Sequence, residues 1–73
     1  MLKDKEVAKE VNQLMLDVGA KLNKSVALAK ERCSESEFKA YRLAVGKILG
    51  EMLMEVMNPL YAEHPDLKPE EMR

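Results

Sequence analysis

An all-α fold is the structure that this 73-residue sequence predicts. Three observations favour it. Apolar residues recur at spacings of three and four over two long stretches, which is the period of an amphipathic helix. Between these stretches lies a short serine- and glutamate-rich segment typical of a helix start. The composition is 47% hydrophobic and 34% charged, with one Phe, two Tyr and no Trp, as expected of a charged, mostly helical chain.

The first predicted helix covers residues 4–33. Asp4 can cap its amino end, and Glu6 lies in the first turn, where the helix dipole favours negative charge. An apolar stripe fills one arc of about 120–140° and keeps its phase across Gly19, so we expect one helix roughly 45 Å long. The face toward its partner is predicted to comprise Val7, Val11, Leu14, Val18 and Leu22. The far side, expected to be solvated, comprises Lys5, Lys9, Asn12, Asn23 and Lys30.

The segment CSESEF predicts the turn of an antiparallel helical hairpin. Ser34 followed by Glu37 is a capping-box pattern before an apolar run. We therefore expect a second helix over residues 35–58, which ends before Pro59 because proline disfavours helical geometry at the preceding residue. The face that packs on the first helix is predicted to comprise Phe38, Tyr41, Val45, Ile48, Leu49, Met52 and Val56.

A further apolar sector lies beside this face of the second helix. It contains Gly46 and Gly50, although each glycine costs about 1 kcal/mol relative to alanine inside a helix. Because the first helix covers only one side, we expect a second copy to lie against the bare glycines in a two-fold interface, giving a homodimeric four-helix bundle. The predicted dimer interface is Leu43, Gly46, Gly50, Leu53, Met54 and Met57. The alternative is that the glycines accommodate the chain's own tail or a bulky side chain of the first helix.

Residues 59–73 are predicted to form a short, partly helical C-terminal tail of a single small domain that covers residues 1–73. Pro59 can open a turn of helix that returns Leu60 and Tyr61 to the bundle, and the KPEEM segment can begin another turn. Chains of this size often need a disulfide, a metal or a partner for stability. The sequence has one cysteine and no zinc-ligand spacing, so self-association is the remaining candidate, although some domains this small fold alone.

No catalytic, cofactor-binding or metal-binding residue is predicted, and we expect no enzyme activity. His64 is the one histidine, and it is interpreted as a turn residue that is exposed or hydrogen-bonded locally. Its acidic neighbours in a proline-bounded turn are not an established metal geometry. Cys33 is interpreted as a buried or half-buried thiol, and the pair Glu51 and Glu55 as part of a solvated charge strip.

The predicted function is that of a small cytosolic interaction or regulatory module that acts as a homodimer. A net charge of −1 supplies no field that favours nucleic acid or an anionic membrane. Met1 and Leu2 are followed by KDKE rather than by an apolar stretch, so we expect no signal peptide, and no apolar run reaches the length of a membrane span. One alternative is a nucleic-acid-associated regulator that uses Lys21, Lys24 and Arg32, although no aromatic residue is interleaved with them. Another is a subunit of a hetero-oligomeric complex.

Overall fold

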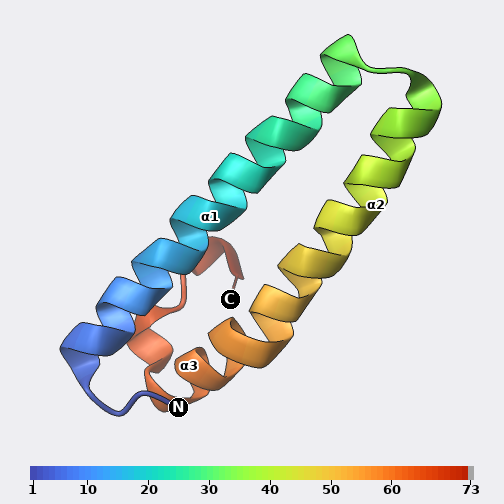
Figure 1. The fold of residues 1–73 in the computed structure, drawn as a ribbon. Coiled ribbons are helices and arrows are strands. Elements are labelled where there is room, and N and C mark those ends of the chain that lie inside the picture. The colour runs from blue at the N-terminus through green and yellow to red at the C-terminus, as the bar shows by residue number, and fades with distance from the viewer. Residues whose placement is uncertain (73) are drawn as a thin grey trace.

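The computed structural model describes residues 1–72, and every secondary-structure element in this range is helical. Two long helices, α1 (Lys5–Arg32) and α2 (Glu35–Glu51), lie antiparallel and side by side (Figure 1). The molecule is elongated, with extents of 44 × 20 × 16 Å. The predicted all-α helical hairpin is confirmed. None of the helices described is long and apolar enough to cross a membrane.

The rest of the chain forms short helical segments that lead back toward the amino end of α1. A π-helical segment, Met52–Met57, connects α2 to a short helix, α3 (Asn58–Glu63). Two 3-10 turns follow, at Pro65–Leu67 and Glu70–Met72. The predicted tail of short helical turns is therefore present, although its first helix is continuous with the second arm of the hairpin.

The amino ends of α1 and α2 carry the caps that the sequence predicts. The Asp4 carboxylate accepts hydrogen bonds from the amides of Glu6 and Val7, at 3.0 and 3.1 Å. The Ser34 hydroxyl accepts from the Glu37 amide, and the Glu37 carboxylate accepts from the Ser34 amide, both at 3.2 Å. This complete capping box satisfies amides that have no partner inside the helix. The backbone and hydroxyl hydrogen bonds from Ser34 lower the pKa of Glu37.

The carboxyl end of the second helix differs from the prediction, because helical geometry continues through Pro59 to Glu63. A proline ring inside a helix collides with the carbonyl four residues earlier and leaves it without a donor. Here the preceding segment widens into a π-turn, in which the Asn58 amide donates to the Leu53 carbonyl five residues back. The wider turn accommodates the ring, so the predicted end at Asn58 is wrong.

The π-turn also changes which side chains face α1. One extra residue in a turn rotates all later side chains by about 100° relative to a regular helix. Met57, which a regular wheel places beside the glycines, is instead only 8% exposed. It belongs to the interior of the chain rather than to the surface predicted for a second copy. Leu60 and Tyr61 are buried too, at 0% and 5% exposed, so their predicted return to the bundle is confirmed.

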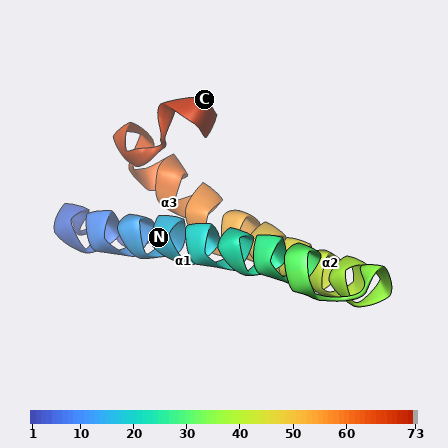
Figure 2. The same cartoon turned by 90° about the horizontal axis from the view of Figure 1, so that it is seen from above.

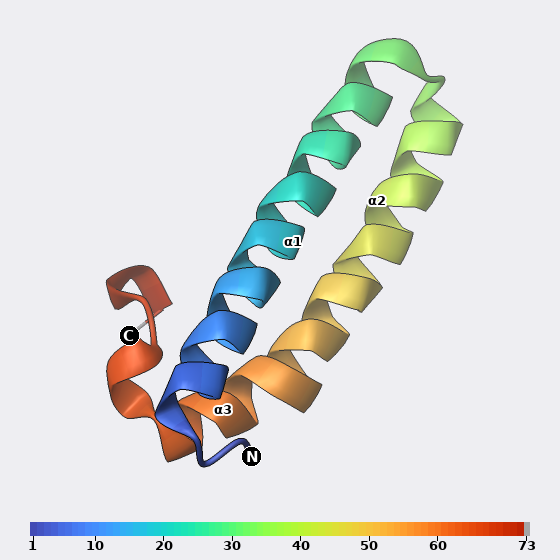
Figure 3. The same ribbon diagram turned by 60° about the vertical axis from the view of Figure 1, so that its left-hand side comes forward.

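The short segments cover one face and one end of the hairpin. Figure 2 shows α1 and α2 as a flat layer with α3 and the tail rising from one side, and Figure 3 places the 3-10 turns beside the amino-terminal half of α1. We call the covered side the tail face and the opposite side the open face. The end that α3 covers is the clasped end, and the end at the hairpin turn is the turn end.

Burial is concentrated at the clasped end. The buried residues are Ala8, Asn12, Val45, Met57, Leu60, Tyr61 and His64. From residue 13 to residue 44 no side chain is buried, although both long helices run through this range. The turn end is therefore held by half-buried side chains alone.

The single chain encloses only part of the predicted hairpin core. Val45 is 3% exposed and lies at its centre. The half-buried members are Val11, Val18, Leu22, Phe38, Leu49, Met52 and Val56. The exposed members are Val7, Leu14, Tyr41 and Ile48, at 43%, 54%, 38% and 49%. Their helical positions place these four on the open face, where no other element of the described chain lies.

Candidate functional site

The densest polar cluster lies at the clasped end, around Asn12 of α1. Its Oδ1 accepts a hydrogen bond from the Tyr61 hydroxyl at 2.5 Å, and its Nδ2 donates to the Leu67 carbonyl at 3.3 Å. Burial raises the pKa of Tyr61, because the phenolate would lose its hydration. One buried amide therefore ties both α3 and the first 3-10 turn to α1.

Two further contacts join the tail to the amino end of the chain. His64 donates from Nε2 to the Leu2 carbonyl at 2.7 Å, and it is 8% exposed. The interpretation of His64 as exposed or locally bonded is wrong, because its partner lies at the other end of the chain. Lys5 pairs with Asp66, and the hydrogen bond from Lys5 lowers the pKa of the Asp66 carboxyl.

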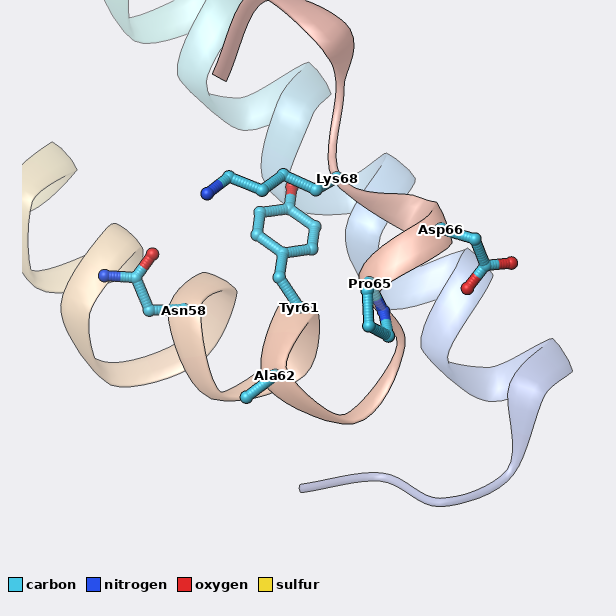
Figure 4. A pocket seen from close by; sticks show the side chains of 6 residues that line it. All are labelled: Asn58, Tyr61, Ala62, Pro65, Asp66 and Lys68. Carbon is cyan, nitrogen blue, oxygen red and sulfur yellow. The ribbon is translucent and has the colours of Figure 1, made fainter. Parts of the chain in front are cut away.

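A shallow hollow of about 750 Å³ opens beside this cluster (Figure 4). Its lining residues are Asn58, Tyr61, Ala62, Pro65, Asp66 and Lys68. The Asp66 carboxylate points away from the Tyr61 ring and pairs with Lys5, while the Tyr61 hydroxyl is bonded to Asn12. General acid–base chemistry requires two groups that are directed at a common point. The Asp66 carboxylate and the Tyr61 hydroxyl are not arranged in this way. Across residues 1–72, no group of three His, Cys, Asp or Glu side chains is placed to hold a metal ion.

The two glycines of α2 face open space. A Cβ atom built on Gly46 or Gly50 meets no atom within 4 Å outside the local helix backbone. Neither the tail nor a side chain of α1 accounts for them, so that alternative is wrong. Leu43 of α2 and Met54 of the π-helical segment are 64% and 69% exposed. We call Leu43, Gly46, Gly50 and Met54 the glycine strip.

An apolar groove of about 750 Å³ adjoins the glycine strip, between α1 and α2 on the tail face. The methionines that line it are Met15, Met52, Met57 and Met72. Leu53, predicted for the dimer interface, is half-buried in its wall and lies one helical turn from Gly50. Methionine side chains adapt to irregular partners, so the groove extends the surface that the glycine strip offers to another helix.

The basic residues proposed for nucleic acid do not converge. Lys21 and Lys24 are exposed on one flank of α1, where Asp17 lies one turn before Lys21. Arg32 lines a separate hollow of about 480 Å³ together with Glu37 and Tyr41, where a phosphate would meet a carboxylate. Nearby Cys33, expected to be buried or half-buried, is exposed, because the chain leaves the helix there and no third element covers the turn end.

Asn12 is the residue of this site that the sequence analysis misplaced on the solvated side. Each of Ala8 and Asn12 follows a predicted core valine by one residue, about 100° around the helix. Ala8, Asn12, Met15 and Gly19 recur at spacings of four, three and four, which is helical periodicity in mostly small or polar residues. Small residues let another element approach closely, and this spacing is the signal for the second packing face of α1.

No protein-family model matches this chain, and no curated protein or solved structure matches it either.

Proposed function

We propose that this chain is a non-enzymatic protein–protein interaction module that acts as a homodimer. The observation that carries the proposal is the lack of any buried side chain from residue 13 to residue 44. Helices that do not pack on a core are only marginally stable in water. A second molecule against this part of the hairpin supplies the burial that the single chain lacks.

Exposed large side chains along both helices support this proposal. Leu14, Leu28, Leu43 and Ile48 are 54%, 52%, 64% and 49% exposed. Covering one such half-exposed side chain contributes on the order of 1 kcal/mol. Leu14, Leu28 and Ile48 lie on the open side of the hairpin and together make a contact surface, whereas Leu43 belongs to the glycine strip on the outer side of α2.

The glycine strip supports a second part of the proposal, in which another helix lies against Gly46 and Gly50. The two glycines cost about 2 kcal/mol of helix stability relative to alanine, and no contact inside the chain offsets this cost. Small residues one turn apart permit close approach of helix backbones, a geometry well known from membrane helices. The docked helix belongs either to a second copy or to a different protein in a hetero-oligomeric complex.

Sedimentation equilibrium and light scattering over a wide range of concentrations test the homodimer. We expect the mass to rise from that of one 8.3 kDa chain toward that of two as the concentration increases, together with greater resistance to unfolding. A single-chain mass at every concentration would contradict the proposal.

Two substitutions at Gly46 test the docking surface, because one should stabilise the chain and the other should weaken binding. Gly46→Ala should stabilise the isolated chain by about 1 kcal/mol, because alanine favours the helix and no atom obstructs its Cβ. Gly46→Leu should keep the far-UV circular dichroism spectrum and weaken any contact that uses the strip. Ala27→Leu, at an exposed position of α1, is the matched control. A drop in dimer mass for Gly46→Leu alone assigns the strip to a second copy, and an unchanged mass assigns it to a different protein.

A further inference from the structure

Seven residues form a continuous exposed strip along α1, on its open-face flank. They recur at alternating spacings of three and four and fall within an arc of about 100° around the helix. We call this set the α1 strip. Its members, all exposed, are Val7, Glu10, Leu14, Asp17, Lys21, Lys24 and Leu28.

The charges on the α1 strip are separated by sign along the helix. Glu10 and Asp17 lie in its amino-terminal half, and Lys21 and Lys24 lie in its carboxyl-terminal half. Within residues 1–72 none of the four forms an ion pair, and Asp17 accepts only a hydrogen bond from Gln13 at 2.9 Å. The apolar members stand between and beyond the charges. The chain therefore leaves both the charges and the apolar groups of the strip without a tertiary partner.

A strip that is acidic in one half and basic in the other complements its own copy when that copy is turned end for end. We infer that the α1 strip pairs with the α1 strip of a second copy, antiparallel, across a two-fold axis. The acidic half of each copy then faces the basic half of the other. Val7, Leu14 and Leu28 are covered by apolar side chains and by the methylene stems of the partner's lysines. Spacings of three and four are also those of a seam between two helices.

The orientation and the position of the contact follow from like charges. A parallel arrangement would place acid against acid and base against base along the strip, which is unfavourable. On the α2 side of the open face, Glu51 and Glu55 line a hollow of about 440 Å³ together with Lys47, and Glu37 lines the hollow near the turn together with Arg32. Two open faces stacked flush and antiparallel would bring these groups together, and the carboxylates there outnumber the cations. The contact is therefore centred on α1, with the α2 helices farther apart.

This inference rests on the proposed homodimer and names the surface that forms it. The glycine strip lies on the outer side of α2, away from the α1 strip, so it stays free for a helix of a different protein. One chain thus offers separate surfaces for its own copy and for another partner.

Charge reversal tests the pairing independently of its exact register. In Glu10→Lys/Asp17→Lys both halves of the strip are basic, and in Lys21→Glu/Lys24→Glu both are acidic. Each variant alone should bind its own copy about ten-fold or more weakly than the wild type, because like charges then face each other. An equimolar mixture of the two should form a one-to-one heterodimer, and the variant with all four substitutions should recover self-association.

Lys9→Glu/Lys30→Glu makes the same change in net charge as Lys21→Glu/Lys24→Glu, but at exposed positions of α1 outside the strip, and it should keep the wild-type mass. Far-UV circular dichroism should confirm that all variants fold, since every substituted side chain is exposed. If the wild type is a dimer and neither reversal changes its mass, the inference is overturned. The homodimer interface would then be assigned to the glycine strip. The inference would also be overturned if each reversal variant self-associated as tightly as the wild type while their mixture associated more tightly. That result would indicate parallel pairing. A wild-type chain that is monomeric at every concentration would overturn the inference together with the proposed function.

Discussion

The clasped end and the turn end consist of the same two helices, yet different contacts stabilise them. At the clasped end Leu60 and Ala8 are fully buried, and Asn12 bonds two segments of the tail to α1. At the turn end the contact between the helices that involves polar groups is a 2.6 Å hydrogen bond between the hydroxyls of Ser25 and Tyr41, both outside any buried core. Two helices alone bury little beyond the seam between them, where Val45 lies, and a third element packed on them enlarges the interior.

This contrast predicts unequal local stability along the same helices. Segments with few buried apolar contacts open at lower free energy than the segments around a core. Amide hydrogen exchange in dilute protein should therefore be faster near the hairpin turn than around Asn12 and Leu60. The four experiments below test the contrast, in order of decreasing expected effect.

Leu60→Ala should have the largest effect, because Leu60 is completely buried. Removing a buried leucine side chain costs about 2–5 kcal/mol, through lost burial and the cavity left behind. That is a large part of the stability of a small domain, so the helical circular dichroism signal should be lost at much lower urea concentration. Leu43→Ala, at a 64% exposed position, is the control and should change the unfolding free energy of the monomer by less than about 0.5 kcal/mol. Equal effects of the two would contradict the contrast between core and surface.

Asn12→Ala should have the next largest effect, because it leaves the Tyr61 hydroxyl and the Leu67 carbonyl without their partner. Unsatisfied buried polar groups cost about 1–3 kcal/mol. Asn23→Ala, at an exposed position of the same helix, is the control. In a double-mutant cycle, Tyr61→Phe should cost less in the Asn12→Ala background than in the wild type, since the shared bond is already lost. Simple additivity in urea denaturation would argue against the buried network.

Ser34→Ala tests the turn end and should destabilise the chain by about 1 kcal/mol, the usual value of an amino-terminal cap. Its effect should be local, with faster amide exchange in the first turn of α2 and little change around α3. Ser36→Ala, two residues away, removes only a long 3.4 Å contact with the Ser34 hydroxyl and leaves the capping box intact, so it should leave exchange nearly unchanged. Uniform acceleration across the molecule would mean that the two ends unfold together.

Acid titration should have the smallest effect and should distinguish the two ends by residue. The folded-state pKa of Asp66 is lowered by the hydrogen bond from Lys5, and that of Glu37 by its bonds from Ser34. Each group therefore contributes stability above its unfolded pKa of about 4, and this contribution is lost as the pH falls through the folded-state value. Both side chains are exposed, so the loss should be modest.

Urea denaturation between pH 2 and pH 6 measures this loss. Asp66→Asn and Glu37→Gln should each flatten the acid dependence, and the glutamine keeps the cap while removing the titration. The two variants should affect amide exchange at the clasped end and the turn end respectively. This explanation would be wrong if both variants showed the same pH dependence of the unfolding free energy as the wild type. At alkaline pH the stability changes in the opposite direction with pH, because burial raises the pKa of Tyr61. Tyr61 therefore contributes stability below its unfolded pKa, and this contribution is lost as the pH rises through the folded-state pKa.

Local sequence signals predicted the hairpin well because they act over a few residues. Asp4 and the Ser34–Glu37 pair determine where the helices start, and their hydrogen bonds are found in the structure. The return of Leu60 and Tyr61 followed from proline at the start of a helical turn. These features need no knowledge of the rest of the chain.

Long-range features were missed because no local pattern encodes them. The partners of Asn12 and His64 lie 49 and 62 residues away, so both side chains could only be read as solvated or locally bonded. Met57 was misplaced because a wheel of constant 100° steps does not include the π-turn. The exposure of Leu14 and Ile48 depends on what a second molecule covers, and a pattern of apolar residues does not distinguish an interior from an interface.

The π-turn of Met52–Met57 has a consequence for how this molecule tolerates changes in length. Removing one residue from that turn would restore an ordinary helix and swing everything beyond it through roughly a quarter of a revolution. Leu60 would then lose its buried position, and the Tyr61 hydroxyl would no longer reach Asn12. The number of residues in this segment thus determines the direction of α3. The fold should therefore tolerate a deletion here far less well than the exchange of one apolar side chain for another.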